Sequence, residues 1–202
     1  MWAGIGDTYA KYYEACISSR DERLEHFTAL GVSISVMCQK PLLEYGAKAY
    51  EDHKKGLCTY EVEQVILAIV VTTGIASIFL TKDYTPDYNS GLAHAIFYAL
   101  TSYPVIEKNH LHGEVVGFGV LLALLVDEQD EEFEKIYQLN KSISLPVSLD
   151  EIEISKEQWE EITDRIPDMS DVSHYPYKVT KEMLKNAMAR LEERVRKDNH
   201  VR

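Results

Sequence analysis

Apolar residues recur every three or four positions along nearly the whole chain, and alternation of apolar and polar residues hardly occurs. A spacing of three and four is typical of amphipathic helices. The pattern therefore predicts an all-α fold, a multi-helix bundle. The expected helices cover about residues 7–20, 24–54, 59–80, 91–102, 112–126, 155–166 and 180–197.

Capping and breaking residues give the expected ends of these helices. Asp7 and Thr8 offer side-chain oxygens that would cap the first helix. Pro41 should open a new segment within the second helical region, because proline lacks an amide hydrogen and clashes with the preceding turn. The connection 82–90 is predicted from a cluster of turn formers, namely Asp83, Pro86, Asp87, Asn89 and Ser90.

The longest apolar run extends from Val65 to Leu80. It contains hydroxyl side chains and Gly74, and it is shorter than the ~20 residues that a bilayer requires. We therefore expect a buried helix at the centre of the fold and no membrane partner. In contrast, the acidic run 127–134 predicts a solvated helix face, with three apolar side chains packing beneath it, namely Phe133, Ile136 and Tyr137.

Length and charge limit the possible functions. A chain of 202 residues is long enough for one domain with a sizeable core. With 21 basic and 33 acidic residues, the formal charge is −12, which would repel a phosphate backbone, so nucleic acid is excluded as a partner. Three cysteines without a CxxC pair, and an N-terminus without an apolar signal segment, predict a cytoplasmic location.

Candidate chemistry resides in three side chains on three separate predicted helices: Asp7, His94 and His112. His94 is surrounded by apolar neighbours, so its imidazole either finds a polar partner in the core or contributes to a site. Gly113 would let another backbone approach His112 closely. Zn²⁺ and Fe²⁺ accept two imidazoles and a carboxylate, which leaves a coordination position for a substrate.

Other kinds of site lack their sequence signals. Gly4-Ile5-Gly6 has neither a preceding strand nor a third glycine at the spacing of a dinucleotide-binding turn. The His-Glu-x-x-His motif of helical zinc proteases is missing, and no serine or cysteine nucleophile motif is evident.

Three segments carry a family resemblance when taken in order: GIGDTYAKYYEA at 4–15, SGLAHAIFYAL at 90–100 and LHGEVVGFG at 111–119. Together they resemble the C-terminal helical domain of the iron-containing alcohol dehydrogenase superfamily, within its glycerol dehydrogenase-like branch. The resemblance extends over about residues 4–189.

This resemblance implies that Asp7, His94 and His112 bind one divalent metal, usually Zn²⁺ in this branch, with Fe²⁺ as the alternative. His112 follows His94 by 18 residues, which is similar to the glycerol dehydrogenase-like branch. In the iron-dependent alcohol branch a fourth ligand, a histidine, stands four residues after the aspartate. Lys11 occupies that position here, so a three-ligand, zinc-type site is favoured.

The resemblance also implies a two-domain enzyme. In the family an N-terminal α/β domain binds NAD(P), so we expect residues 1–202 to form a single helical metal-binding domain from which the nucleotide-binding domain is absent. NAD(P) would bind only with that missing domain, and the chain alone would show little dehydrogenase activity. Phe97 and Tyr98 stand where family members often carry a further histidine, so substrate contacts would differ.

The substrate class and the assembly are left open. A small polyol and a 2-hydroxy acid are both compatible with the resemblance. The chain could instead be a non-catalytic helical assembly module, or half of a split enzyme. It would then form a homo-oligomer or bind a separate nucleotide-binding domain. A dehydroquinate synthase-like lyase would use the same arrangement of metal ligands, and it is the least favoured of these functions.

Overall fold

The computed structural model describes residues 1–82, 85–86 and 88–200, so the predicted turn formers Asp83 and Asp87 lie outside the described residues. This part of the chain is helical, with one two-residue antiparallel ladder, β1 (Thr81–Lys82) and β2 (Thr85–Pro86). The all-α class is confirmed. The α-helices are α1 (Trp2–Ser18), α2 (His26–Lys54), α3 (Tyr60–Leu67), α4 (Thr73–Leu80), α5 (Leu92–Leu100), α6 (Pro104–Asn109), α7 (His112–Val126), α8 (Asp130–Ile143), α9 (Lys156–Ile162) and α10 (Lys181–His200).

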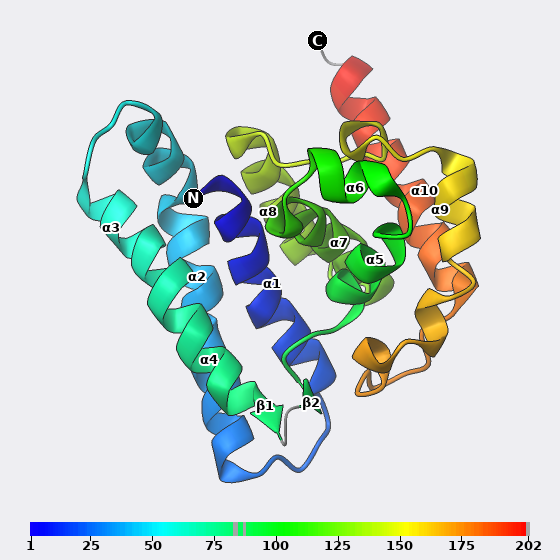
Figure 1. Ribbon diagram of the computed structural model, residues 1–202, viewed down its shortest axis with the longest axis horizontal. Helices are drawn as coiled ribbons and strands as arrows, with labels where there is room; N and C mark the ends of the chain where they lie inside the picture. Colours follow the sequence, from blue (N-terminus) through cyan, green and yellow to red (C-terminus); the bar gives the residue numbers. More distant parts are fainter. Residues whose placement is uncertain (83–84, 87, 201–202) are drawn as a thin grey trace.

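Helix α7 forms the centre of the bundle. Every residue from Gly113 to Val126 is buried, and α7 packs against α1, α5, α8 and α10. A helix that is apolar on all sides can be accommodated only where neighbours surround it. Figure 1 shows α1 between α7 and the paired helices α2 and α3–α4, with α9 and α10 on the opposite side.

The apolar run that we expected at the centre lies instead at one edge of the bundle (Figure 1). It forms one helical run, α3, the π-helical segment η1 (Ala68–Thr72) and α4, which packs against α2. Only 22% of its most apolar 18-residue window is buried, and by length and composition alone this run could cross a membrane. The predicted central position is wrong, because apolar composition does not determine which of two apolar helices becomes surrounded.

Two local predictions about helix ends are also wrong. Helix α1 begins at Trp2, so Asp7 and Thr8 lie inside it and do not cap it. Helix α2 continues through Pro41, which is buried. A proline inside a helix loses one hydrogen bond, and the packing of α2 against α1, α3, α4 and α8 offsets that loss.

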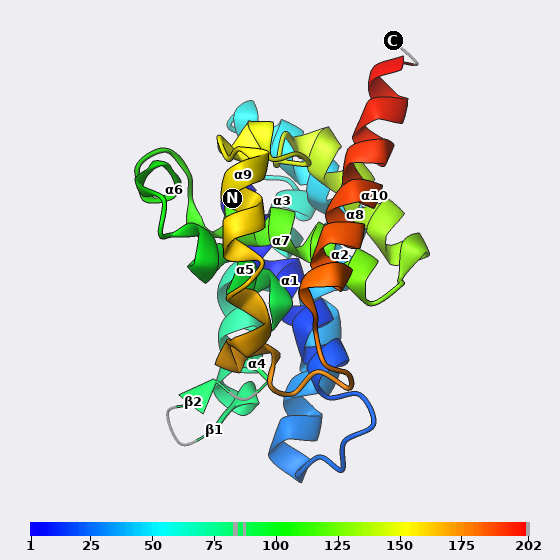
Figure 2. The same cartoon turned by 90° about the vertical axis from the view of Figure 1, so that its right-hand side faces the viewer.

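Polar side chains cap two other helices, and the predicted packing beneath the acidic run is confirmed. Thr59 caps α3 by accepting a hydrogen bond from the amide of Val62, and Ser155 forms a capping box with Gln158 at α9. The acidic run leads into α8, whose Phe133, Ile136 and Tyr137 are buried. Short 3₁₀ turns connect the later helices: η2 (Asp150–Ile152), η3 (Ile166–Asp168) and η4 (Ser170–Val172). The C-terminal end of α10 extends beyond the other helices (Figure 2).

Candidate metal centre

The crossing of α1 and α7 brings the first candidate ligands together. A Cβ atom added to Gly6 would lie 2.1 Å from the carbonyl oxygen of Gly113, and one added to Gly113 would lie 2.0 Å from that of Ala3. The two backbones therefore touch, which only glycine permits at such a distance. This close approach sets Asp7 of α1 beside His112, the first residue of α7.

Helix α5 adds the third side chain. Nε2 of His112 lies 3.3 Å from Oδ1 of Asp7, and Nε2 of His94 lies 3.6 Å from the same oxygen. One donor atom from each residue falls within 4.8 Å of the other two. Within the described part of the chain, no other three His, Cys, Asp or Glu side chains bring their potential ligand atoms so close together.

The group is open on one side. The side chain of His94 is 8% exposed, that of Asp7 34% and that of His112 44%. Burial raises the pKa of Asp7, but hydrogen bonds from His112 and His94 outweigh burial and hold that pKa well below its usual range. A side chain that stays ionised and faces solvent with two imidazoles can serve as an anionic ligand.

His94 is held from behind by Glu14 of α1. Its Nδ1 lies 2.6 Å from Oε2 of Glu14, whose other oxygen accepts from the amides of Gly91 and His94 at 2.9 and 3.0 Å. Burial lowers the pKa of His94, whereas the charge of Glu14 and hydrogen bonds to Asp7 and Glu14 raise it to about 9. A carboxylate only accepts hydrogen bonds, so Nδ1 carries a proton and Nε2 faces Asp7.

Lys11 fills the position where the iron-dependent branch has its fourth ligand. It is buried, and its ammonium group donates to the backbone oxygen of Asn89 and to Oδ1 of Asn89, the latter at 2.7 Å. Burial lowers the pKa of Lys11, while the charges of Glu14 and Asp7 act in the opposite direction. Lys11 thus contributes a buried charge near the group and is held by Asn89.

Two aromatic side chains border the open side. The ring of Phe97 meets that of His112 edge to face at 4.4 Å between centroids. The ring of Tyr98 lies 6.2 Å from that of His94 and is 47% exposed. A small molecule that approached the three donor atoms would therefore meet aromatic surface.

Our reading of the sequence missed Glu14. Glu14 lies in the first quoted segment, seven residues after Asp7, and residues separated by seven share one helix face. It is fully buried, and a buried carboxylate requires a partner. The spacing from Asp7 was the available signal in the sequence, and the structure adds the burial that shows Glu14 must have a partner.

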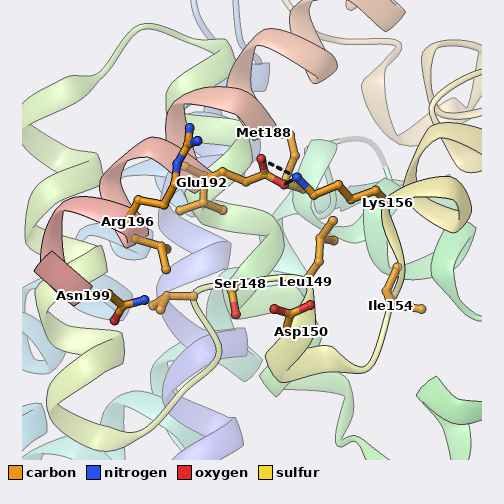
Figure 3. A pocket seen from close by; sticks show the side chains of 12 residues that line it. Ser148, Leu149, Asp150, Ile154, Lys156, Met188, Glu192, Arg196 and Asn199 are labelled. Carbon is orange, nitrogen blue, oxygen red and sulfur yellow. Dashed lines mark hydrogen bonds and ion pairs between the residues drawn. The ribbon is translucent and has the colours of Figure 1, made fainter.

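A separate hollow lies between α10 and the segment that precedes α9 (Figure 3). Its volume is about 270 Å³, and Leu149, Ile154 and Met188 are among its apolar lining residues. Lys156 and Glu192 form an ion pair at 2.8 Å on its border. None of the three candidate ligands lines it, so it is separate from the candidate metal centre.

Comparison with known proteins gives the same family as the three segments. The chain is 29% identical to glycerol dehydrogenase of Escherichia coli O6:H1 over 163 residues, which is 77% of this chain and 41% of that protein. It is 28% identical to hydroxycarboxylate dehydrogenase A of Escherichia coli K12 over 197 residues, which is 95% of this chain and 53% of that protein. No protein-family profile matches the chain.

These relatives, a glycerol dehydrogenase and a hydroxycarboxylate dehydrogenase, match the glycerol dehydrogenase-like branch of the iron-containing alcohol dehydrogenase superfamily. The resemblance stated from the three segments is confirmed. The chain spans about half the length of the curated relatives it matches.

Solved structures of glycerol dehydrogenases share the fold. A probable glycerol dehydrogenase from Sinorhizobium meliloti 1021 superposes with a TM-score of 0.81 at 24% identity, over 97% of this chain and 55% of that one. Glycerol dehydrogenase from Schizosaccharomyces pombe superposes with a TM-score of 0.78 at 22% identity, over 96% of this chain and 50% of that one. At these identities the likeness shows the fold alone.

Proposed function

We propose that this chain is the metal-binding helical domain of an NAD(P)-dependent dehydrogenase that acts on a small polyol or a 2-hydroxy acid. Asp7, His94 and His112 are its metal ligands in this proposal. The observation that carries it is the convergence of one carboxylate oxygen and two imidazole nitrogens from three helices within 4.8 Å. The glycerol and hydroxycarboxylate dehydrogenases among the relatives supply the reaction class.

The donor set fits a divalent ion. Zinc binds nitrogen and oxygen ligands at roughly 2.0–2.2 Å in a tetrahedron, so its ligand atoms stand about 3.3–3.6 Å apart. The two distances to Asp7, 3.3 and 3.6 Å, are close to that value. Three protein ligands leave a position for a substrate oxygen, and such a mixed donor set suits Zn²⁺ or Fe²⁺.

The residues around the ligands have separate roles in this proposal. A bound ion would lower the pKa of a substrate hydroxyl and so favour hydride transfer to the nicotinamide. Glu14 fixes the tautomer and the orientation of His94, as carboxylates behind metal-bound histidines do. Phe97 and Tyr98 lie beside the two histidines and would limit the space for the substrate, which favours a small carbon chain.

Further parts of the proposal concern the whole protein. The hydride acceptor, NAD(P), would bind a separate α/β domain and not residues 1–202. The chain would then form one side of a catalytic cleft, and a nucleotide-binding domain would form the other side. The location proposed for this enzyme is the cytoplasm. A second candidate, a non-catalytic assembly module, is supported by the exposed apolar residues of α3–α4.

Metal analysis of the purified chain separates the two candidates. We expect one equivalent of bound metal after purification without chelator, and a large loss in Asp7→Ala, His94→Ala and His112→Ala. His53→Ala removes an exposed histidine of α2 and should leave the metal content unchanged. Unchanged metal in the three ligand variants would disprove the ligand assignment. A chain that binds no metal would favour the assembly module.

Glu14→Gln tests the positioning role. The substitution keeps the shape but weakens the hydrogen bond to His94, and we expect zinc affinity to fall by about 10–100-fold, as for other partners of ligating histidines. Asp52→Asn is the control, because Asp52 is a buried carboxylate that accepts from Lys48 and Thr59. Competition titration with a zinc indicator measures both, and equal affinities would assign Glu14 to folding alone.

A further inference from the structure

A continuous apolar surface covers one side of the paired helices α2 and α3–α4. Along α3–η1–α4 the exposed positions repeat every three or four residues, so they form one stripe. Phe27 of α2 stacks on Phe79 at 5.7 Å between ring centroids, and this contact joins the start of α2 to the end of the stripe. We call the following set the apolar face: Phe27, Leu30, Ile66, Leu67, Val70, Val71, Ile75 and Ile78.

The apolar face is as large as the largest apolar patches that monomers expose. Its eight side chains are 39–73% exposed. If a large apolar side chain offers about 150 Å², these eight leave roughly 600 Å² of apolar area uncovered, at the upper end of what a monomer exposes. Each partner in a standard interface buries ~800 Å², so the apolar face alone supplies most of the area that a dimer of this size requires.

The centre of the face has the spacing of a helix-pairing seam. Leu67, Val71, Gly74 and Ile78 follow one another at intervals of four, three and four, which is the a/d spacing of coiled coils. A Cβ atom added to Gly74 would have no neighbour within 4 Å. The seam therefore has a depression in its middle, into which a side chain from another helix can pack.

We propose that the apolar face is a self-association surface on which a second copy of this chain binds through an antiparallel pairing of α3–α4. A two-fold axis between Thr72 and Thr73 sets Leu67 of one copy opposite Ile78 of the other, and Val71 opposite Gly74. Each contact occurs twice in such an arrangement, because a two-fold interface uses one patch on both partners. Antiparallel helix dipoles also favour it.

Charge favours a second copy over a lipid surface. From Gln64 to Leu80 the helical run contains no charged residue, so two copies meet there without repulsion even though each carries a net charge of −12. Helices that lie on membranes carry lysine and arginine beside their apolar side. This run has none, and Glu61 and Glu63 stand at its start.

Sedimentation velocity of the 202-residue chain from 1 to 100 µM tests the proposal. We expect a reversible monomer–dimer equilibrium, and a dimer dissociation constant at least tenfold higher in Val70→Glu and in Ile78→Glu, with unchanged helical circular dichroism. Leu57→Glu is the control, because Leu57 is half exposed but lies before α3; it should dimerise like the parent. A parent chain that stays monomeric, or a dimer that both variants retain, would overturn the proposal.

Cross-linking tests the antiparallel register. In a Cys58→Ser background, which removes the exposed native thiol, a mixture of Val71→Cys and Gly74→Cys chains should form mixed disulfide dimers faster than either variant alone. Preferential dimers of Val71→Cys with itself would contradict the antiparallel pairing. Binding of the monomer to vesicles of phosphatidylcholine and phosphatidylglycerol, with no dimer in solution, would assign the face to lipid instead.

Discussion

Helix α7 and the helical run α3–η1–α4 are both apolar, yet they occupy opposite environments. Neighbours surround α7 from Gly113 to Val126, whereas the other run packs on α2 and exposes a stripe on its outer side. The glycines of α7 account for the difference. Gly113, Gly117 and Gly119 let α1 and α5 approach to backbone contact, whereas a Cβ atom added to Gly74 of α4 would meet nothing within 4 Å. Helix α7 is central because its backbone can approach those of α1 and α5 closely, and apolar content alone does not distinguish it from α3–η1–α4.

Truncation of one side chain in each helix should produce the largest contrast. Leu122→Ala opens a cavity at a fully buried site of α7, and we expect the free energy of unfolding to fall by about 2–5 kcal/mol. Val70→Ala on the apolar face should change it by about 0.5 kcal/mol or less. Urea denaturation at a protein concentration below dimer formation measures both. Equal losses would mean that Val70 is covered within one chain.

An added methyl group at Gly113 should produce the next largest effect. In Gly113→Ala the new Cβ meets the carbonyl oxygen of Ala3, so α1 and α7 must separate, at a cost of roughly 1–3 kcal/mol in unfolding free energy. Because the same crossing sets Asp7 beside His112, zinc affinity should fall as well. Calorimetric unfolding measures the loss of stability, and a zinc titration measures the loss of affinity. Normal zinc affinity in a destabilised variant would show that zinc binding does not depend on the close crossing of α1 and α7.

The same substitution in α4 should have the smallest effect, and the opposite sign. Gly74→Ala adds a methyl group in open space inside a helix, and alanine stabilises a helix interior by up to about 1 kcal/mol relative to glycine. We expect a small rise in unfolding free energy in dilute monomer. A fall there would show that the apolar face is packed within one chain, which would remove the contrast between the two helices.

Short-range signals predicted much of the local structure. The spacing of three and four residues predicted most of the helices, and two of them, α3 and α9, begin at hydroxyl side chains that cap them, Thr59 and Ser155. The predicted break at Pro41 and the predicted cap at Asp7 are wrong, because packing overrides both local signals. The packing of α2 tolerates a lost hydrogen bond, and α1 extends to Trp2, where Asp7 is already part of the helix.

The candidate site was predictable in part. The resemblance of three motifs identified Asp7, His94 and His112 as candidate ligands, but their spacing along the chain did not give the distances between their side chains. Glu14 and Lys11 were visible as residues on the Asp7 face of α1, but their partners, His94 and Asn89, lie about 80 positions further along the chain. No periodicity reports a contact between such distant residues.

The sequence by itself determined the helical class, most helix boundaries, the family and the three candidate ligands, because these depend on local periodicity, capping chemistry and short motifs. Only the tertiary structure decided that α7 is central, that α3–α4 leaves an apolar face uncovered and that Glu14 orients His94. These features depend on how closely two backbones can approach, and that distance is set by pairs of residues that meet only when the chain is folded.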